Sequence, residues 1–156
     1  ITDAYSKKIV GYNVSDNLNT ESSLAALRLA IKQRKNKELP LIHHSDRGLQ
    51  YCANEYQKML NKNEIKPSMT QNSDPYENAV AERINGILKQ EFYIDKYNKD
   101  LPIMKKIIKE TVDIYNEKRP HLSNHMLTPN QMHLQNKLIM KTYKTKNSIK
   151  NVFDAV

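Results

Sequence analysis

The sequence is poor in the residues that build disulfides and sulfur-ligated metal sites. Its 156 residues include one cysteine, three glycines and no tryptophan. The single thiol, Cys52, excludes an intramolecular disulfide and is too little for a structural zinc site, which is typical of a protein of the reducing cytoplasm. We expect Cys52 to be buried. Apolar residues cluster in periodic segments, none long enough to span a bilayer, so no membrane attachment is expected.

Charge of one sign is in excess. Lysine and arginine total 25 against 17 acidic residues, a net charge of +8. A basic surface attracts polyanions, and nucleic acid is the first candidate partner. A protein that is lysine-rich for other reasons would have the same composition. The charge therefore indicates nucleic-acid binding only together with a sequence motif. The length suits a single domain with one site, and the first residues already have the pattern of a strand, so we expect the chain to begin within a fold.

The amino-terminal half alternates strand and helix patterns. The elements predicted there are, in chain order, a β-hairpin over residues 1–15, a helix beginning at Thr20, a buried strand over 39–44, a helix over 53–63 and a strand over 65–70. The strand over 39–44 runs into a glycine-containing turn at 45–48. Polar residues delivered by such a turn lie where α/β proteins place their chemistry.

The carboxyl-terminal half is predicted to be helical. A polar loop over 71–75 leads into a helix from Pro75 to about residue 93, and a second helix over 102–117 turns six residues inward. These six are Ile103, Ile107, Ile108, Thr111, Val112 and Tyr115. Residues 118–121 break that helix, a short helix follows Pro129, and a basic tail ends the chain. Together the elements predict an α/β fold with a mixed β-sheet flanked by helices.

Two acidic residues stand at chemically useful places. Asp46 follows the predicted buried strand, and Glu82 lies within the helix after the next strand, with 35 residues between them. Carboxylate oxygens suit Mg²⁺ or Mn²⁺, and phosphodiester chemistry commonly uses two such ions. Taken singly, an aspartate that caps a turn and a glutamate that faces solvent are the simpler explanations.

The surroundings of Glu82 favour a functional helix face. Asn78, Glu82, Asn85 and Lys89 follow at spacings of four, three and four residues, so they share one face of the helix. The other face carries Val80, Ile84, Ile87 and Leu88. A polar stripe with a carboxylate and a lysine seven residues apart could hold a metal at one end and a DNA phosphate at the other. An ordinary solvated helix face is the alternative.

Three segments together resemble a known family. They read HSDRGLQY at 44–51, NSDPYENAVAERINGILKQE at 72–91, and YNEKRPH at 115–121 followed by Thr128-Pro129. In this order they closely resemble the integrase-type catalytic core of bacterial DDE insertion-sequence transposases, which are related to retroviral integrases. The 35-residue spacing and the position of Lys89 agree with that family. The resemblance covers residues 1–135 and leaves 136–156 as a basic carboxyl-terminal tail.

The resemblance implies a ribonuclease-H-like fold in which three carboxylates bind two Mg²⁺ or Mn²⁺ ions. Asp46 would be the second carboxylate and Glu82 the third, both of them catalytic residues and metal ligands. Lys89 would contact DNA at the end of the element, with Asn78 and Asn85 lining the same groove. Arg47, beside Asp46, would touch a phosphate or pack at the strand end, and packing is the simpler role for it and for His44.

The sequence departs from the family at its beginning. The first carboxylate of the family lies on a strand that precedes the segment corresponding to Asp3-Ala4-Tyr5-Ser6-Lys7, and we expect that central strand to be missing from this sequence. Asp3 matches a later, non-catalytic aspartate, so we expect its role to be structural. With two of three ligands the chain alone should bind metal weakly and be inactive. Its unpaired sheet edge would favour self-association, and a homo-oligomer is expected.

The leading functional hypothesis is DNA transposition. The parent protein would cleave the ends of an insertion element and transfer them into target DNA in a metal-dependent reaction, acting at the nucleoid in the bacterial cytoplasm. The first alternative is a catalytically silent DNA-binding or assembly fragment, because the first carboxylate is missing. A related nuclease that cuts RNA/DNA hybrids is a third possibility with the same fold.

Overall fold

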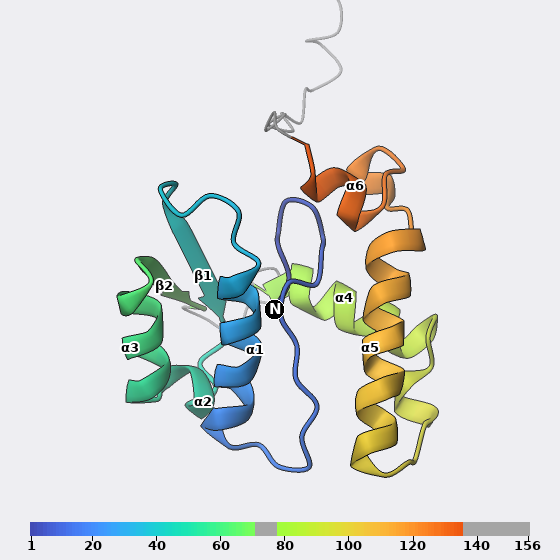
Figure 1. Ribbon diagram of the computed structural model, residues 1–156, viewed down its shortest axis with the longest axis horizontal. Coiled ribbons are helices and arrows are strands. Elements are labelled where there is room, and N and C mark those ends of the chain that lie inside the picture. The colour runs from blue at the N-terminus through green and yellow to red at the C-terminus, as the bar shows by residue number, and fades with distance from the viewer. Residues whose placement is uncertain (71–77, 136–156) are drawn as a thin grey trace, which may run out of the picture.

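The computed structural model describes residues 1–70 and 78–135. Their elements form two groups on either side of the amino-terminal segment (Figure 1). One group contains α1 (Thr20–Lys32), β1 (Leu41–Ser45), α2 (Leu49–Cys52), α3 (Asn54–Lys62) and β2 (Ile65–Met69). The other contains α4 (Ala79–Gln90), η2 (Ile94–Lys96), α5 (Leu101–Lys118), η3 (Leu122–Asn124) and α6 (Pro129–His133). The loop predicted over 71–75 and the basic tail over 136–156 lie outside the described residues.

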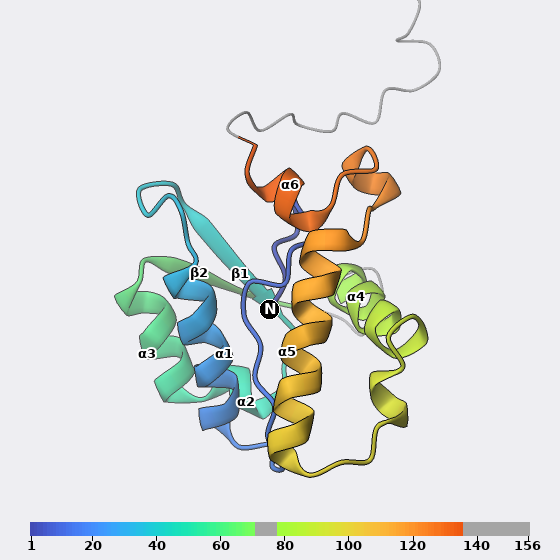
Figure 2. The ribbon, with the colours of Figure 1, turned by 45° about the vertical axis from the view of Figure 1, so that its right-hand side comes forward.

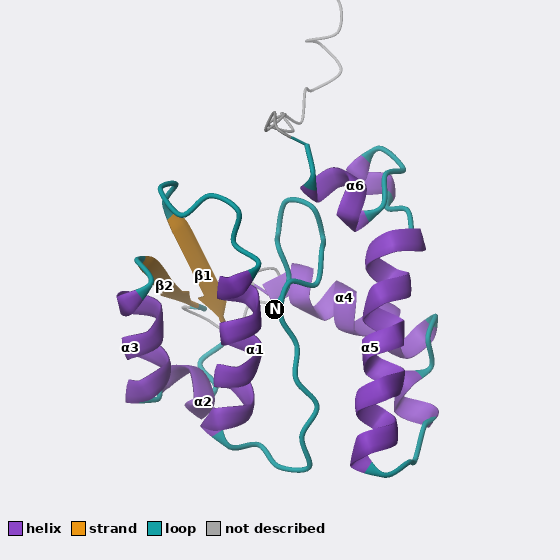
Figure 3. Cartoon of the chain, viewed as in Figure 1, coloured by secondary structure: helices purple, strands orange, loops and turns teal. Residues whose placement is uncertain are grey.

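The two strands pair in parallel, the arrangement that a strand-helix-strand alternation favours. β1 and β2 run in register from Leu41 opposite Ile65 to Ser45 opposite Met69, and α3 joins them. Parallel strands need such a crossover connection, and α3 packs against β2 (Figure 3). Because the strands are parallel, the residues that follow Ser45 and Met69 emerge at the same edge of the sheet.

The burial predicted for β1 is wrong. Leu41 and Ile42 are 41% and 61% exposed, and Ser45 is the buried residue of the strand. Within the described part of the chain, β1 pairs with β2 alone, so one edge of the strand has no neighbour there to cover its side chains. Cys52, also predicted to be buried, is exposed at the end of α2.

The first hydrophobic core joins α1 to the strand-helix unit, which is formed by β1, α2, α3 and β2. The side chain of Asn19 accepts a hydrogen bond from the amide of Ser22 and caps α1, which begins at Thr20 as predicted. Leu24 and Leu27, three residues apart, then face the same way. The buried residues of this core are Leu24, Leu27, Tyr56, Leu60 and Ile65.

The second hydrophobic core joins α4 and α5 to the amino-terminal segment. Its buried residues are Ile9, Ile84, Ile87, Val112 and Tyr115. The inward face predicted for α5 is confirmed for Thr111, Val112 and Tyr115, which are buried. Ile103 was predicted to face inward and is 48% exposed. It precedes Val112 by nine residues, which is two and a half helical turns, so it lies on the opposite side of the helix.

The amino-terminal segment turns back on itself but does not form the two predicted strands. One antiparallel bridge joins Thr2 to Ile9, around a turn in which Lys7 has a φ of 64°. A distant side chain replaces the missing strand partner. The side-chain amide of Asn116 makes two hydrogen bonds to Ile9. Its Oδ1 accepts from Ile9 N and its Nδ2 donates to Ile9 O, both at 3.0 Å. The segment is therefore held by α5 and not by a sheet.

Candidate active site

Asp46 lies in the turn at the carboxyl end of β1. Its Oδ1 accepts a hydrogen bond of 2.9 Å from the amide of Gly48, and its side chain is exposed. The next residue ties the turn to the other strand, because Arg47 Nε donates to Thr70 O at 2.8 Å. Thr70 N in turn donates to Ser45 O at 3.1 Å. These bonds hold the Asp46 carboxylate at the edge where both parallel strands end.

The two histidines of β1 face opposite sides of the sheet. His44 is exposed, and its Nδ1 lies 2.9 Å from Ser68 Oγ on β2, consistent with the packing role predicted for it at the strand end. His43 lies against α3, with its Nε2 3.0 Å from the hydroxyl of Tyr56. Burial lowers the pKa of His43 below its usual value. Only His44 is therefore on the solvent side near Asp46.

The polar stripe predicted on α4 is confirmed for three of its four residues. Glu82, Asn85 and Lys89 are exposed, whereas Ile84 and Ile87 are buried. Glu82 lies in the first turn, where the helix dipole favours a carboxylate. Asn78 precedes the helix as its N-cap residue, half-buried and without a capping hydrogen bond from its side chain.

α4 is shorter than predicted. Its predicted start at Pro75 lies outside the described residues, and the helix ends at Gln90, about three residues early. Two features end it there. The side chain of Glu91 is held by Arg119, and Tyr93 adopts a left-handed conformation with a φ of 54° that a helix cannot continue through.

The two predicted carboxylates come from neighbouring ends of β1 and α4. Figures 1 and 2 both show the carboxyl end of β1 and the amino end of α4 beside the amino terminus of the chain. Each end presents an exposed carboxylate, Asp46 or Glu82. Anionic oxygen donors are the ligands that Mg²⁺ and Mn²⁺ prefer. Among the residues that the structure describes, no three His, Cys, Asp or Glu side chains are grouped to hold a metal.

Two family models of the integrase core domain match the sequence, one over residues 1–75 and the other over 63–129. The chain belongs to the integrase core family. The two matches together run through the residues that carry Asp46, Glu82 and the YNEKRPH segment.

This integrase core is similar to proteins of bacterial insertion sequences. It is 36% identical over 125 residues to the 31 kDa protein of insertion element IS600 from Shigella sonnei, covering 78% of this chain and 44% of that protein. It is 34% identical over 119 residues to the transposase of IS629 from the same organism, covering 76% and 40%. The chain spans between a third and a half of the length of the curated relatives that it matches.

Solved structures show the fold of this integrase core. The catalytic core domain of HTLV-2 integrase in complex with magnesium matches with a TM-score of 0.62 at 21% identity, covering 85% of this chain and 80% of that one. The catalytic core domain of BIV integrase matches with a TM-score of 0.60 at 17% identity, covering 82% and 81%. The predicted ribonuclease-H-like fold is confirmed. Across the described ranges no helix has the length and hydropathy to span a membrane.

Asp3 has the structural role predicted for it. Its Oδ2 accepts from the amide of Ser6 at 2.9 Å and from the Ser6 hydroxyl, and lies 3.4 Å from Nδ1 of His133. Burial alone would raise the pKa of Asp3, but the hydrogen bonds from His133 and Ser6 outweigh it and lower the pKa to about 2. Asp3 thus fastens the amino-terminal turn to α6.

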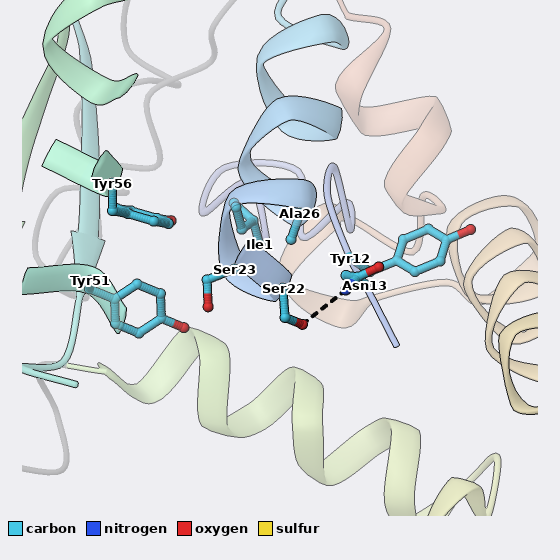
Figure 4. Close-up of a pocket in the computed structure, with 8 residues that line it drawn as sticks. All are labelled: Ile1, Tyr12, Asn13, Ser22, Ser23, Ala26, Tyr51 and Tyr56. Atoms are coloured by element: carbon cyan, nitrogen blue, oxygen red, sulfur yellow. Dashed lines mark hydrogen bonds between the residues drawn. The ribbon is translucent and has the colours of Figure 1, made fainter. Parts of the chain in front are cut away.

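A hollow of about 250 Å³ lies between the amino-terminal segment and the strand-helix unit of the integrase core. Figure 4 shows the rings of Tyr51 and Tyr56 on one side of it and Ile1, Ser22 and Ser23 on the other. The lining includes neither Asp46 nor Glu82. The hollow is therefore separate from the candidate site.

The YNEKRPH segment makes long-range polar contacts that sequence reasoning did not assign. The Tyr115 hydroxyl donates to Lys7 O at 2.8 Å, and Asn116 holds Ile9 as described above. Arg119 forms an ion pair with Glu91 at the end of α4. Tyr115 and Asn116 lie within α5 and Arg119 is its C-cap residue, so the helical pattern gave no signal of these long-range polar contacts.

Acid is expected to destabilise this integrase core through His121. Burial, followed by the nearby Arg119 charge, lowers the pKa of His121 from its ordinary value of 6.5 to about 4. As the pH falls from about 6.5 towards 4, the unfolded chain binds a proton that the folded chain does not, so stability falls. The window lies above that of Asp3, whose contribution is lost as the pH falls from 3.8 towards 2.

Replacing the imidazole tests this. We expect His121→Gln to flatten the decline of the urea midpoint between pH 7 and pH 4 without removing it, because the pKa of His43 is lowered as well. An unchanged slope in this variant would contradict the assignment. Glu117→Gln, an exposed change in the same segment, should leave the profile unaltered.

Proposed function

We propose that this chain is the catalytic core of a transposase that cleaves the ends of an insertion element and joins them to target DNA. The observation that carries the proposal is the pair of exposed carboxylates, Asp46 and Glu82, at neighbouring ends of β1 and α4. Their spacing, in a chain similar to insertion-sequence transposases, supports the same chemistry.

We assign Asp46 and Glu82 as catalytic residues and ligands of divalent metal, Mg²⁺ or Mn²⁺. Bound metal would activate the attacking oxygen and offset the charge that develops on the leaving oxygen. Both side chains are exposed and supply the anionic oxygens that such ions need. The magnesium named with the HTLV-2 integrase core supports this choice, and two ions are expected in a complete site.

Positive and amide side chains around the carboxylates are assigned to DNA. Lys89 is exposed on the same face of α4 as Glu82, and a lysine there attracts a phosphate without reading sequence. Asn85 shares that face and Asn78 lies at its beginning. Arg47 Nε holds the turn in place through its hydrogen bond to Thr70 O. We assign the other nitrogens of its exposed guanidinium to a DNA phosphate. The net charge of +8 supports a polyanionic partner.

We place the first carboxylate on a strand that would precede residue 1 in a longer protein. Two observations support this. Asp3 is engaged by Ser6 and His133, and the greater length of the relatives leaves room for a further strand. Without that strand the chain would bind DNA but would not catalyse cleavage or joining. This is the alternative function, a catalytically silent DNA-binding or assembly fragment. The dimeric and trimeric forms named for HTLV-2 integrase support a homo-oligomer as the working assembly.

The test compares this chain with a version extended upstream through the proposed strand, called the extended protein below. Both are incubated with labelled element-end DNA, target DNA and Mg²⁺. The proposal predicts joined products with the extended protein only, and DNA binding by both. Joining by the short chain would assign the first carboxylate to a residue within it. Binding without joining in both would favour the assembly-fragment alternative.

A further inference from the structure

The carboxyl-terminal ends of α4 and α5 meet in one ion pair. Arg119 Nε and Nη2 each donate to a different carboxylate oxygen of Glu91 at 2.6 Å, in a bidentate arrangement. The Arg119 side chain is 20% exposed and that of Glu91 45%. The pairs Arg28–Glu21 and Lys109–Asp113 are more exposed, and each lies within one helix. Of these three ion pairs, the pair between Arg119 and Glu91 is therefore the one that connects two helices.

The helix termini explain why the pair is found here. Glu91 is the C-cap residue of α4 and Arg119 that of α5. A carboxylate at the carboxyl end of a helix is repelled by the helix dipole, and a cation is attracted. The Arg119 guanidinium lies at both ends and offsets the unfavourable charge of Glu91. The negative charge of Glu91 at the carboxyl end of α4 is thus offset mainly by its ion pair with Arg119.

The pair is anchored to the rest of the fold. Arg119 Nη1 donates to Pro120 O at 3.2 Å and lies 3.3 Å from Nε2 of the buried His121. The His121 ring meets that of Tyr115 edge-on, with centroids 5.4 Å apart. Tyr115 in turn donates to Lys7 O. The end of α4 is connected in this way to the amino-terminal turn that lies between the two groups of elements.

We propose that Arg119 and Glu91 are positioning residues that set the direction of α4. The inference rests on the proposed function, in which Glu82 binds metal at the other end of this helix. Glu82 precedes Glu91 by nine residues, about 13 Å along the axis. A tilt of about five degrees at the pair would move Glu82 by about 1 Å, and misplacements of that size cost about 100-fold in rate.

The test measures the direction of α4 in this chain without requiring catalysis. Cys52 is exposed and is the single cysteine, so it takes one spin label, and Asn85→Cys on α4 takes the second. The distribution of distances between the labels is compared in Glu91→Gln, in Arg119→Gln and in the charge exchange Glu91→Arg with Arg119→Glu. The matched control is Asp113→Asn, which removes the exposed pair on α5.

We expect each single variant to broaden or shift the distribution, the exchange to narrow it again, and the control to leave it unchanged. An unchanged distribution in both single variants would overturn the proposal, as would equal broadening in the control. If a single variant does not fold, Arg119→Lys keeps the charge but not the bidentate bonds, and should give an intermediate broadening. No broadening in that folded variant would equally overturn it.

A second arm separates this inference from the proposed function. In the extended protein, well below its melting temperature, Arg119→Lys should lower kcat for strand transfer by about 10-fold or more with little change in KM for DNA. A shifted distance distribution together with an extended protein that never joins DNA would refute the proposed function alone. Normal kcat with an unchanged distribution would refute the positioning role alone.

Discussion

Glu82→Gln is expected to lower strand transfer by the extended protein about 1000-fold, because a lost metal ligand removes several kcal/mol of transition-state stabilisation. The change keeps the size of the side chain and leaves the exposed surface of α4 polar, so folding and DNA binding should persist. Rates of product formation and DNA affinity are measured side by side. This outcome would separate a catalytic glutamate from one that merely faces solvent.

The matched control is Glu55→Gln. Glu55 is also exposed and lies in the first turn of α3, as Glu82 lies in that of α4. Any effect of losing a favourable charge near the amino end of a helix is therefore shared by the two variants. Equal loss of activity in Glu82→Gln and Glu55→Gln would contradict the assignment of Glu82 as a metal ligand. Full activity of Glu82→Gln would also contradict that assignment.

Asn116→Ala is expected to lower the free energy of unfolding by about 3 kcal/mol, since two backbone groups of Ile9 lose their partners together. The Asn116 side chain is buried, and both of its hydrogen bonds to Ile9 measure 3.0 Å. An unpaired buried donor or acceptor costs more than an exposed one because water cannot replace the missing bond. Urea denaturation of this chain gives the value.

Glu117→Ala provides the comparison for Asn116. It is the next residue of α5, is exposed, and removes a side chain of similar size. We expect it to change stability by less than about 0.5 kcal/mol. If Asn116→Ala were equally mild, the amino-terminal segment would not depend on α5 for its place.

Local periodicity was sufficient to predict most helices and the two strands β1 and β2. Leu24 and Leu27 recur at helical spacing, and so do Ile84 and Ile87, because each pair buries one face of its helix. The same logic gave the exposed positions of Glu82 and Lys89. The position of Asp46 after β1 followed from an apolar run ending in a glycine-containing turn.

Contacts between distant residues were beyond that reasoning. Ile9 is satisfied by Asn116, 107 residues away, so a segment with a strand pattern forms a single bridge. Glu91 is held by Arg119, 28 residues away, and α4 ends earlier than its pattern suggested. The exposure of Ile42 could not be predicted either, because a strand's burial depends on its neighbours and not on its own composition.

The central claim is that Asp46 and Glu82 bind one shared site for divalent metal, and binding of Mn²⁺ tests it most directly. Free Mn²⁺ is counted by electron paramagnetic resonance as it is titrated into this chain, Asp46→Asn, Glu82→Gln, the double variant and Glu55→Gln. We predict that either single change weakens binding by about 10-fold, that the double variant is no weaker than the singles, and that Glu55→Gln binds as the unaltered chain does. Unchanged Mn²⁺ affinity in both Asp46→Asn and Glu82→Gln would contradict the claim.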